Sequence, residues 1–550
     1  MKRFFAVIVG ILAIVSVAQA QFLSVDGISN RYYRDLQLLS RQSLDNSWML
    51  RPIRVEDGLF TETTQKYKGR GIFEEVELDI HQVQWSSLYN SEYGYGRNLG
   101  SIFPSNGMTS RFSLQLSGRY RNFKYQLDPE LIFAQNKSFQ VYPSSYPDWL
   151  WSLLYPEYLN LIDAPEMYRE ASFMQILPGN SSIGFERWNM ELALTTRSMW
   201  WGPGKRNSLL MSNNAPGFAH LTLNTVRPIQ VIWGKIEFQM FWGRLVESGK
   251  DPIPYRMYEN LQPMPYIPKP DDWRMIQGLT AIWQPKWSPG LYLGLGRTLV
   301  TYSKEIKRFD HAFSVFRSLK YYQDHIRDTD LSDLGDQFDD KLTAFVRYAM
   351  PEDKMEFYAE YARNLRPGSL LDLFRNPEHT MAYTIGLTKL YDFGPDQYIG
   401  VDLELTHLEK ENTWRERYYP TWYTSRIVPH GYTNRGQVMG ASIGPGSNSQ
   451  YLGVNYLWGK NRVGVFGERV IYNNDLYYIL FTTSIYRLWA DLNFGVSGEY
   501  HWRRFGLKYD LTFMNTFNYK YIELTTRPGF EYIGNDLFNV NLSTSLIYRF

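Results

Sequence analysis

The end of the chain limits the possible folds more than any other feature. Residues 537–550 alternate with a period of two, and one face carries the mostly apolar set Phe538, Val540, Leu542, Thr544, Leu546, Tyr548 and Phe550. Successive side chains of a β-strand point to opposite faces, so this pattern predicts a strand with one apolar and one polar face. A final strand that ends on an aromatic residue indicates a barrel-closing strand of the outer membrane. A half-buried strand of a soluble sheet is the alternative.

Composition supports the barrel. Aromatic residues make up 17% of the chain, yet the mean hydropathy is only −0.39. After residue 20 no apolar run approaches the length of about 18 residues that a membrane-spanning helix needs. Barrel strands alternate lipid-facing with lumen-facing residues, which gives many aromatics without apolar runs. The net charge of +2 and the lack of a basic stripe speak against a nucleic-acid partner.

The N-terminus predicts export. Lys2 and Arg3 precede an apolar run over 4–17, and the small-x-small sequence Ala-Gln-Ala ends at Ala20. This is typical of a secretory signal peptide cleaved between Ala20 and Gln21. The chain has no cysteine, which excludes disulfides and a lipid on an N-terminal Cys. We therefore expect three parts: a signal peptide (1–20), a periplasmic helical cap or plug (21–70) and an outer-membrane barrel (71–550).

The early segment 29–44 lacks strict alternation. It places Leu36, Leu38 and Leu39 among Arg and Gln, which predicts a short amphipathic helix that ends before Pro52. This helix precedes the first clear strand. We expect it in the periplasm or against the barrel mouth.

Most of the remaining chain repeats one theme, about ten alternating residues followed by a turn, and offers 14 to 18 strands by eye. Short turns such as Arg121-Asn122 and Gly459-Lys460 suit the periplasmic side, because outer-membrane barrels carry their long loops outside. The predicted long connections are 136–182, 246–272, 302–339, 364–378 and 409–449. Several are densely aromatic, as at 142–160 and 413–432, and predict folded lids or pocket walls rather than disorder.

One stretch between two predicted strands, 188–194 and 229–233, combines aromatic, turn-forming and basic residues: WWGPGKRNSLLMSNN (200–214). Tryptophan rings stack on sugar rings, amide and hydroxyl groups bind sugar hydroxyls, and basic groups complement an acidic glycan. The candidate polysaccharide-binding residues are Trp200, Trp201, Lys205, Arg206, Asn207, Asn213 and Asn214. The alternative is a structural constriction that packs the lumen.

Other chemistries find little support. The Gly204-Lys205 pair fails as a phosphate loop, since Met199 and Arg206 stand at two positions that the loop requires as glycine and Ser or Thr. The histidines lack zinc-site spacing, and no nucleophile motif occurs. Six aspartates between 328 and 340 could supply calcium ligands but lack the EF-hand spacing, which favours a solvated acidic loop. We predict no catalytic residue, no metal site, no cofactor and no enzymatic activity.

The stretches WWGPGKRNSLLMSNN (200–214) and GYTNRGQVMGASIGPGSNS (431–449) resemble the two signature stretches of the Wzi capsule-assembly family. Residues 93–120 and DLQLLS (35–40) are similar to the N-terminal region of that family. The matching signature positions are Gly202, Pro203, Gly204, Gly436, Gln437, Gly440, Gly444 and Pro445. The likeness runs from about residue 29 to the C-terminus.

The resemblance implies an all-β transmembrane antiparallel barrel of about 18 strands with a small helical periplasmic segment. It implies a lectin-like, non-catalytic protein in the outer membrane of a Gram-negative bacterium, which holds capsular or exopolysaccharide at the cell surface. Outer-membrane lipids, lipopolysaccharide and other capsule-export proteins are the further partners expected. A channel for sugars or other small solutes is the alternative function.

Overall fold

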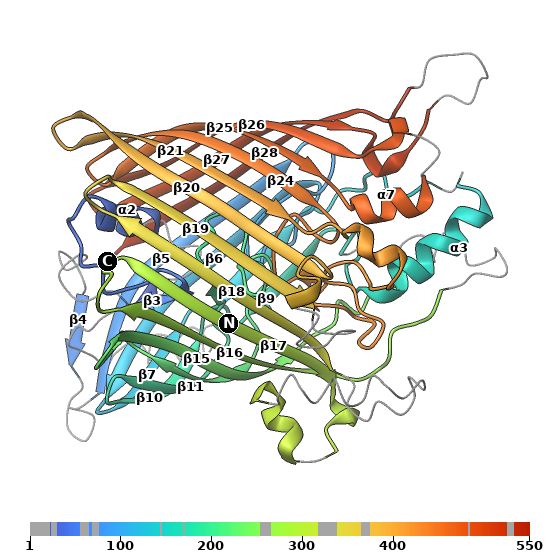
Figure 1. Cartoon of the computed structure of the whole chain (residues 1–550). Coiled ribbons are helices and arrows are strands. Elements are labelled where there is room, and N and C mark those ends of the chain that lie inside the picture. Colours follow the sequence, from blue (N-terminus) through green and yellow to red (C-terminus); the bar gives the residue numbers. More distant parts are fainter. Residues whose placement is uncertain are drawn as a thin grey trace, which may run out of the picture.

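The chain forms a closed antiparallel barrel of 18 strands around a filled interior (Figure 1). The structure is a computed structural model and describes residues 22–23, 30–54, 65–68, 76–143, 146–168, 171–252, 266–307, 309–316, 338–364, 374–481, 485–524 and 533–550. The predicted signal peptide (1–20) and the aspartates 328–336 lie outside these residues, and the division at residues 20 and 70 stays a prediction.

Hydrogen bonding between the first and last wall strands closes the barrel, with Leu542 opposite Tyr89. Three of the 18 wall positions consist of two short strands each. In wall order the strands are β5 (Val76–Asn90), β6 (Gly107–Tyr120), β7 (Phe123–Leu127) with β8 (Glu130–Ala134), β9 (Phe173–Leu177) with β10 (Ser182–Arg187), β11 (Met190–Thr195), β13 (His220–Thr225) with β14 (Ile229–Val231), β15 (Gly234–Leu245), β16 (Arg274–Pro285), β17 (Leu291–Tyr302), β18 (Asp339–Met350), β19 (Met355–Asn364), β20 (Met381–Gly394), β21 (Gln397–His407), β24 (Asn448–Trp458), β25 (Asn461–Ile471), β26 (Ala490–Trp502), β27 (Phe505–Phe517) and β28 (Leu537–Arg549). A short strand, β4 (Gln65–Lys68), adds to β5.

The alternation of the sequence becomes the two faces of this wall. On β28, Phe538, Leu542 and Leu546 point outward and are 54%, 36% and 42% exposed. Asn539 and Asn541 point inward and are buried. The outward set is the apolar face predicted from the C-terminus, so the prediction of a barrel-closing strand is confirmed.

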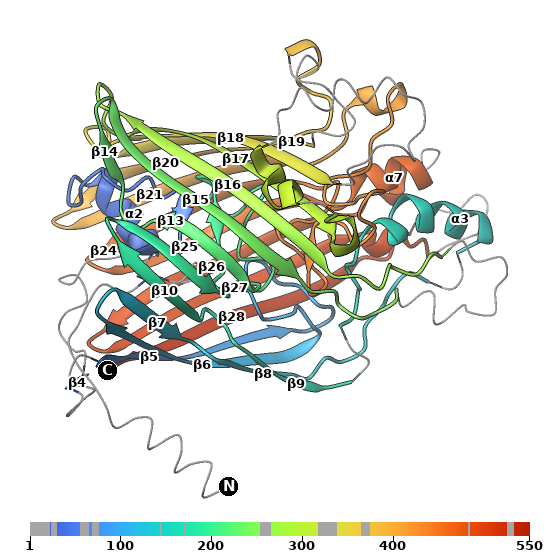
Figure 2. The same cartoon turned by 90° about the horizontal axis from the view of Figure 1, so that it is seen from below.

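The two ends of the barrel differ. Tight turns, such as those at 351–354 and 503–504, lie at one end together with the C-terminus (Figures 1 and 2). The long connections lie at the other end, and they carry the helices α3 (Asp148–Glu157) and α7 (Asn474–Leu480). Short 3₁₀ turns occur at η2 (Leu159–Leu161), η3 (Ser303–Glu305), η4 (Phe309–Phe316), η5 (Asn412–Arg415), η6 (Ile485–Arg487) and η7 (Tyr519–Tyr521).

Two predicted boundaries are wrong. Trp188 does not begin a strand, because Trp188 and Asn189 both have positive φ angles, of 52° and 66°, and form the tight turn between β10 and β11. Such a turn matches the twist of the two strands that it joins. The predicted connection 136–182 also contains β9, a five-residue strand whose pattern is too short to stand out.

The inside of the barrel holds three parts of the chain. The first is the helix α2 (Asn30–Leu38) at the short-turn end, followed by β2 (Leu50–Arg51) and β3 (Ile53–Arg54), with β1 (Phe22–Leu23) paired to β3. The other two are the segments 196–219 and 408–447, here together called the plug; the exposed residues between 410 and 426 of the second segment reach the surface at the long-loop end. The two plug segments contain β12 (Trp200–Trp201), β22 (Thr433–Asn434) and β23 (Gln437–Val438).

A buried apolar cluster joins the plug to the wall. It includes Trp201, Leu209 and Met211 of the first plug segment and Tyr423, Tyr432 and Met439 of the second. Wall residues Phe241 and Ile276 complete the contact. Since each of these side chains is nearly or fully buried, the plug is packed as a protein core and not as a loose loop.

Aromatic side chains also close the long-loop end. Trp151 and Tyr155 of α3 pack with Tyr477 of α7 and with Tyr521 in one buried cluster. Among the described residues, no helix has the length and apolar character needed to cross a membrane.

The outward face predicts a position-dependent cost for charge. Leu403 lies outward near the middle of β21, so we expect Leu403→Arg to lower the free energy of unfolding in lipid vesicles by about 2–4 kcal/mol. The matched change Tyr391→Arg, on an exposed side chain near a short turn, should cost only about 0–1 kcal/mol. Equal costs in urea unfolding would contradict the assignment of this face to lipid.

Candidate functional site

The two tryptophans that open the stretch 200–214 lie inside the plug. Trp201 is fully buried. Its indole Nε1 donates to Gln239 Oε1 at 2.8 Å, and its ring meets the Phe241 ring edge-on at a centroid distance of 5.4 Å. Trp200 is 3% exposed, and the Arg51 guanidinium lies 4.3 Å from its ring centroid. Both rings therefore serve packing in this structure, and their contact with polysaccharide stays a prediction.

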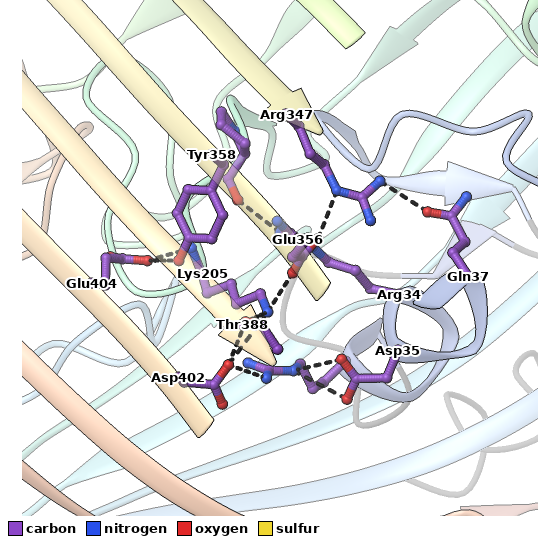
Figure 3. Close-up of polar contacts among 12 residues, drawn as sticks. Arg34, Asp35, Gln37, Lys205, Arg347, Glu356, Tyr358, Thr388, Asp402 and Glu404 are labelled. Atoms are coloured by element: carbon purple, nitrogen blue, oxygen red, sulfur yellow. Dashed lines mark hydrogen bonds and ion pairs between the residues drawn. The ribbon is translucent and has the colours of Figure 1, made fainter. Parts of the chain in front are cut away.

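The next residues are held by one wall carboxylate. Glu404 of β21 accepts hydrogen bonds from the backbone N–H groups of Lys205 at 2.7 Å, Arg206 at 3.1 Å and Asn207 at 2.8 Å. The Tyr358 hydroxyl donates to the same carboxylate at 2.7 Å (Figure 3). Three consecutive N–H groups aimed at one carboxylate fix the turn at 205–207 against the wall.

The Lys205 side chain reaches two further wall carboxylates. Its Nζ lies 2.5 Å from Glu356 Oε1 and 3.4 Å from Asp402 Oδ1. The same carboxylates bind the N-terminal helix: Arg34 Nε donates to Glu356 at 3.1 Å (Figure 3). Arg31 Nη2 donates to Asp402 at 2.5 Å. The wall, the plug and α2 thus share one set of ion pairs.

Arg206 is bound in the same way on the other side. Its Nη2 lies 3.1 Å from Glu468 Oε2 of β25, and its guanidinium lies 4.3 Å from the centroid of the Tyr451 ring. Glu468 Oε1 also forms an ion pair with Arg97 Nη1 at 2.5 Å. We call the four wall carboxylates Glu356, Asp402, Glu404 and Glu468 with these partners the inner network.

Two signature glycines have clear steric reasons. Gly202 has a φ of +107°, and a side chain there would approach Glu360 Oε2 to 2.7 Å. At Gly204 a Cβ atom would lie 1.8 Å from the Asn207 carbonyl oxygen. Larger residues would prevent the tight path that brings Pro203 and Lys205 onto the inner network.

The remaining candidates bind the first plug segment to the wall, to residue 98 and to the second plug segment. Asn207 Nδ2 donates to Thr406 Oγ1 at 3.2 Å, Asn213 Nδ2 to the Asn98 carbonyl at 3.0 Å and Asn214 Nδ2 to the Val438 carbonyl at 2.9 Å. In the second segment, Gly436 and Gln437 lie in the hairpin between β22 and β23, followed by Gly440, Gly444 and Pro445. The second signature stretch is therefore a folded-in segment.

A polar cavity of about 230 Å³ lies between α2, the plug and the wall strands β19, β21 and β24–β27. Lys205 and Arg206 line it, so these two of the seven predicted binding residues face a space that could hold a ligand. Its other charged lining residues are Arg31, Arg34, Arg51, Asp402, Glu404, Arg462, Glu499, Lys508 and Asp510.

A different group of side chains faces outward at the long-loop end. We call it the outer patch: Glu157 at the end of α3, with Lys410, Trp414, Tyr418 and Arg426 of the second plug segment. The Arg426 guanidinium lies 4.1 Å from the Tyr418 ring centroid, and its side chain is 54% exposed. The Tyr418 hydroxyl donates to Glu157 Oε2 at 2.9 Å.

Lys410 sits beside two rings of the outer patch. Its Nζ lies 5.5 Å from the Trp414 ring centroid and 5.2 Å from that of Tyr418. Partial burial lowers the pKa of the Lys410 ammonium, and nearby Asp475 opposes that effect. Aromatic faces, two cations and one carboxylate meet on an accessible surface, which is a suitable arrangement for a polar ligand with ring faces.

The sequence predicted the first plug segment but not its partners. Glu404 and Asp402 alternate with outward leucines along β21, which indicates only that they face the lumen. Trp414, Tyr418 and Arg426 of the outer patch fall in the aromatic connection 413–432, whereas Glu157 lies in 142–160 and Lys410 in the longer connection 409–449. Among the described residues no group of three or more His, Asp or Glu side chains could hold a metal ion.

The inner network predicts a defect in the plug when one carboxylate is lost. Glu404→Gln leaves the three N–H donors of 205–207 without their charged acceptor, and we expect a loss of about 3 kcal/mol in stability. The unfolding midpoint should fall, and conductance in planar bilayers should rise as the plug loosens. Glu416→Gln, at an exposed position of the second plug segment, is the control and should change neither. If Glu404→Gln, like the control, left the unfolding midpoint and the conductance unchanged, this role of Glu404 would be contradicted.

The comparisons with known proteins agree with this geometry. A search of the solved structures finds Wzi of Escherichia coli, an outer membrane protein involved in group 1 capsule assembly and described as a carbohydrate-binding β-barrel. It shares 12% identity over 97% of this chain and 100% of that chain, with a TM-score of 0.56, and shows the fold.

More distant likenesses are OccAB2 of Acinetobacter baumannii and OccK2 (OpdF) of Pseudomonas aeruginosa. The former has 10% identity over 85% of this chain and 98% of that chain, with a TM-score of 0.41. The latter has 9% identity over 87% of this chain and 99% of that chain, with a TM-score of 0.40. No curated protein matches this chain by sequence.

The family described as capsule assembly protein Wzi matches residues 83–474, which is more than half of the 550-residue chain. The antiparallel barrel of 18 strands with its small N-terminal helix is the fold that the resemblance to this family implies. The chain belongs to the Wzi capsule-assembly family and is an outer-membrane protein of a Gram-negative bacterium.

Proposed function

We propose that this protein binds capsular or exopolysaccharide at the cell surface and holds it there, without catalysis. The observation that carries the proposal is the outer patch, which presents aromatic faces and cations at the long-loop end of the barrel. That end faces the outside, because outer-membrane barrels keep their short turns in the periplasm. Membership of a capsule-assembly family supports the same ligand class.

The chemistry of the outer patch favours an acidic glycan. The C–H faces of a sugar ring can stack on Tyr418 and Trp414. The exposed Arg426 can bind a sugar carboxylate with two parallel hydrogen bonds, and Lys410 adds a second positive charge. Glu157 holds both Arg426 and Tyr418 in place, which lowers the entropy lost on binding.

The alternative is a channel for sugars or other small solutes. The buried apolar cluster between plug and wall argues against an open path, since Trp201 and Tyr423 are fully buried in the lumen. The inner network further binds the plug to the wall. A filled barrel leaves its outer surface, rather than its lumen, as the place where a long polymer can bind.

The seven predicted residues of the first plug segment have a supporting role in this proposal. Lys205, Arg206 and Asn207 hold the plug, and the plug segment 408–447 carries four residues of the outer patch. Direct contact of Trp200 or Trp201 with glycan remains a prediction. Lipopolysaccharide and other capsule-export proteins remain proposed partners.

Deletion of the gene tests the function as a whole. We expect the same total amount of polysaccharide as in the wild type, with a larger share in the medium and a smaller share on the cells. Assays of uronic acid or total sugar in the cell fraction and in the medium measure the two shares. An unchanged surface coat would contradict the proposal, and a solute conductance in planar bilayers would then favour the channel.

Substitutions in the outer patch test the site. Tyr418→Ala and Arg426→Gln each remove a stacking face or a cation, and we expect each to weaken retention about tenfold. Tyr418→Phe keeps the ring, and Trp149→Ala alters an exposed tryptophan of α3 outside the patch, so both should retain the coat. Equal shedding by Trp149→Ala and Tyr418→Ala would show that the loss is not specific to the patch.

A further inference from the structure

The cavity inside the barrel lies in its periplasmic half. Two of its lining residues, Glu499 and Lys508, are only a few positions from the short turn at 503–504. Arg31 and Arg34 of α2 line the same space. Ser497, Glu499 and Lys508 keep partly exposed surfaces although they point into the barrel. The cavity is therefore a solvent-filled space, well separated from the outer patch.

The lining carries more positive than negative charge. Seven cationic side chains (Arg31, Arg34, Arg51, Lys205, Arg206, Arg462 and Lys508) face four acidic ones (Asp402, Glu404, Glu499 and Asp510). The neighbours in direct contact do not cancel this excess. Asp35, Glu356 and Glu468 add three negative charges, and Arg97 and Arg347 add two positive charges. An anion entering the cavity would meet a surface of net positive charge.

Several lining nitrogens also lack an acceptor. Arg34 is 3% exposed, its Nε donates to Glu356 and its Nη1 to the Pro203 carbonyl, yet its Nη2 has no hydrogen-bond partner among the described residues. The same holds for Arg51 Nε, Arg206 Nε and Trp48 Nε1. These four nitrogens are buried beneath the lining, so the cations that a ligand can reach are the partly exposed side chains of Arg31, Arg206 and Arg462.

We propose that this cavity is a binding site for a sugar that carries a carboxylate, such as a uronic acid, and that it is entered from the periplasm. The carboxylate would pair with the partly exposed cations of the lining, Lys508, Arg206 and Arg31. The volume of about 230 Å³ exceeds the space that a few waters need. The choice of a sugar as ligand rests on the proposed function, whereas the site itself rests on the cavity.

Such a site would give the protein a second contact with acidic glycan on the opposite side of the plug from the outer patch. Lys508 is the most informative residue for a test. It lines the cavity but contributes to none of the inner-network ion pairs, so its removal leaves the plug in place.

The first experiment measures binding to the purified full-length barrel in detergent by isothermal titration calorimetry. We expect sodium glucuronate to bind, and glucose and inorganic phosphate to bind at least tenfold more weakly. Lys508→Gln should weaken glucuronate binding about tenfold. Lys460→Gln, an exposed lysine of a short turn at the same end, is the matched control and should bind like the wild type.

The second experiment uses the absence of native cysteine. Ser497→Cys places one thiol in the cavity, and Asn412→Cys places one on the exposed outer surface. A maleimide too large to cross the outer membrane should label Asn412→Cys in intact cells, and Ser497→Cys only after the outer membrane is permeabilised. Glucuronate should slow the labelling of Ser497→Cys by a small maleimide at least fivefold, whereas glucose should not.

The inference is overturned if glucuronate neither binds nor protects, or if glucose does so equally well. Phosphate binding as tight as that of glucuronate would indicate a general anion site and also contradict it. Labelling of Ser497→Cys in intact cells would refute entry from the periplasm. A barrel that retains polysaccharide on cells but fails these tests refutes only the inner site; a deletion strain with an unchanged coat refutes the proposed function instead.

Discussion

The structure depends on charge that is buried in the barrel and must be neutralised there. Glu356, Asp402 and Glu468 point from the wall into the interior and are at most 4% exposed. An unpaired carboxylate in such a place would cost several kcal/mol, so the wall alone would be a poor structure. The plug and α2 supply the arginines, the lysine and the backbone N–H groups that neutralise these carboxylates. Wall, plug and helix are therefore one cooperative unit, and the position of each depends on the others.

This dependence also explains which features the sequence could predict. The lipid face follows from local alternation, so β28 and most hairpins were predicted with correct turns. The inner network could not be predicted, because an inward Glu404 looks like any lumen-facing residue and its partner Lys205 is 199 positions away. No local pattern connects two such residues. Trp188 was misplaced for a related reason, since a turn of two residues with positive φ interrupts a run that still alternates.

The stretch 200–214 shows how one composition serves two purposes. Tryptophans, asparagines and basic residues are the side chains that bind sugars, and they are also those that fill a polar lumen with hydrogen bonds. The sequence left both interpretations open, and the structure buries most of the stretch. The outer patch uses the same chemistry on an accessible surface. Its residues are spread over α3 and the second plug segment, from Glu157 to Arg426, and only folding brings them together.

The closure of the barrel by β5 and β28 has a consequence for how the protein assembles. The last strand cannot pair with the first until the whole chain is present, and the contacts that bridge them span more than 450 positions. Contacts so distant in sequence make folding slow. Each plug segment is joined at both ends to wall strands, the first to β11 and β13 and the second to β21 and β24. The seam between the two strands thus waits for the last residues of the chain, however early the local hairpins of the wall form.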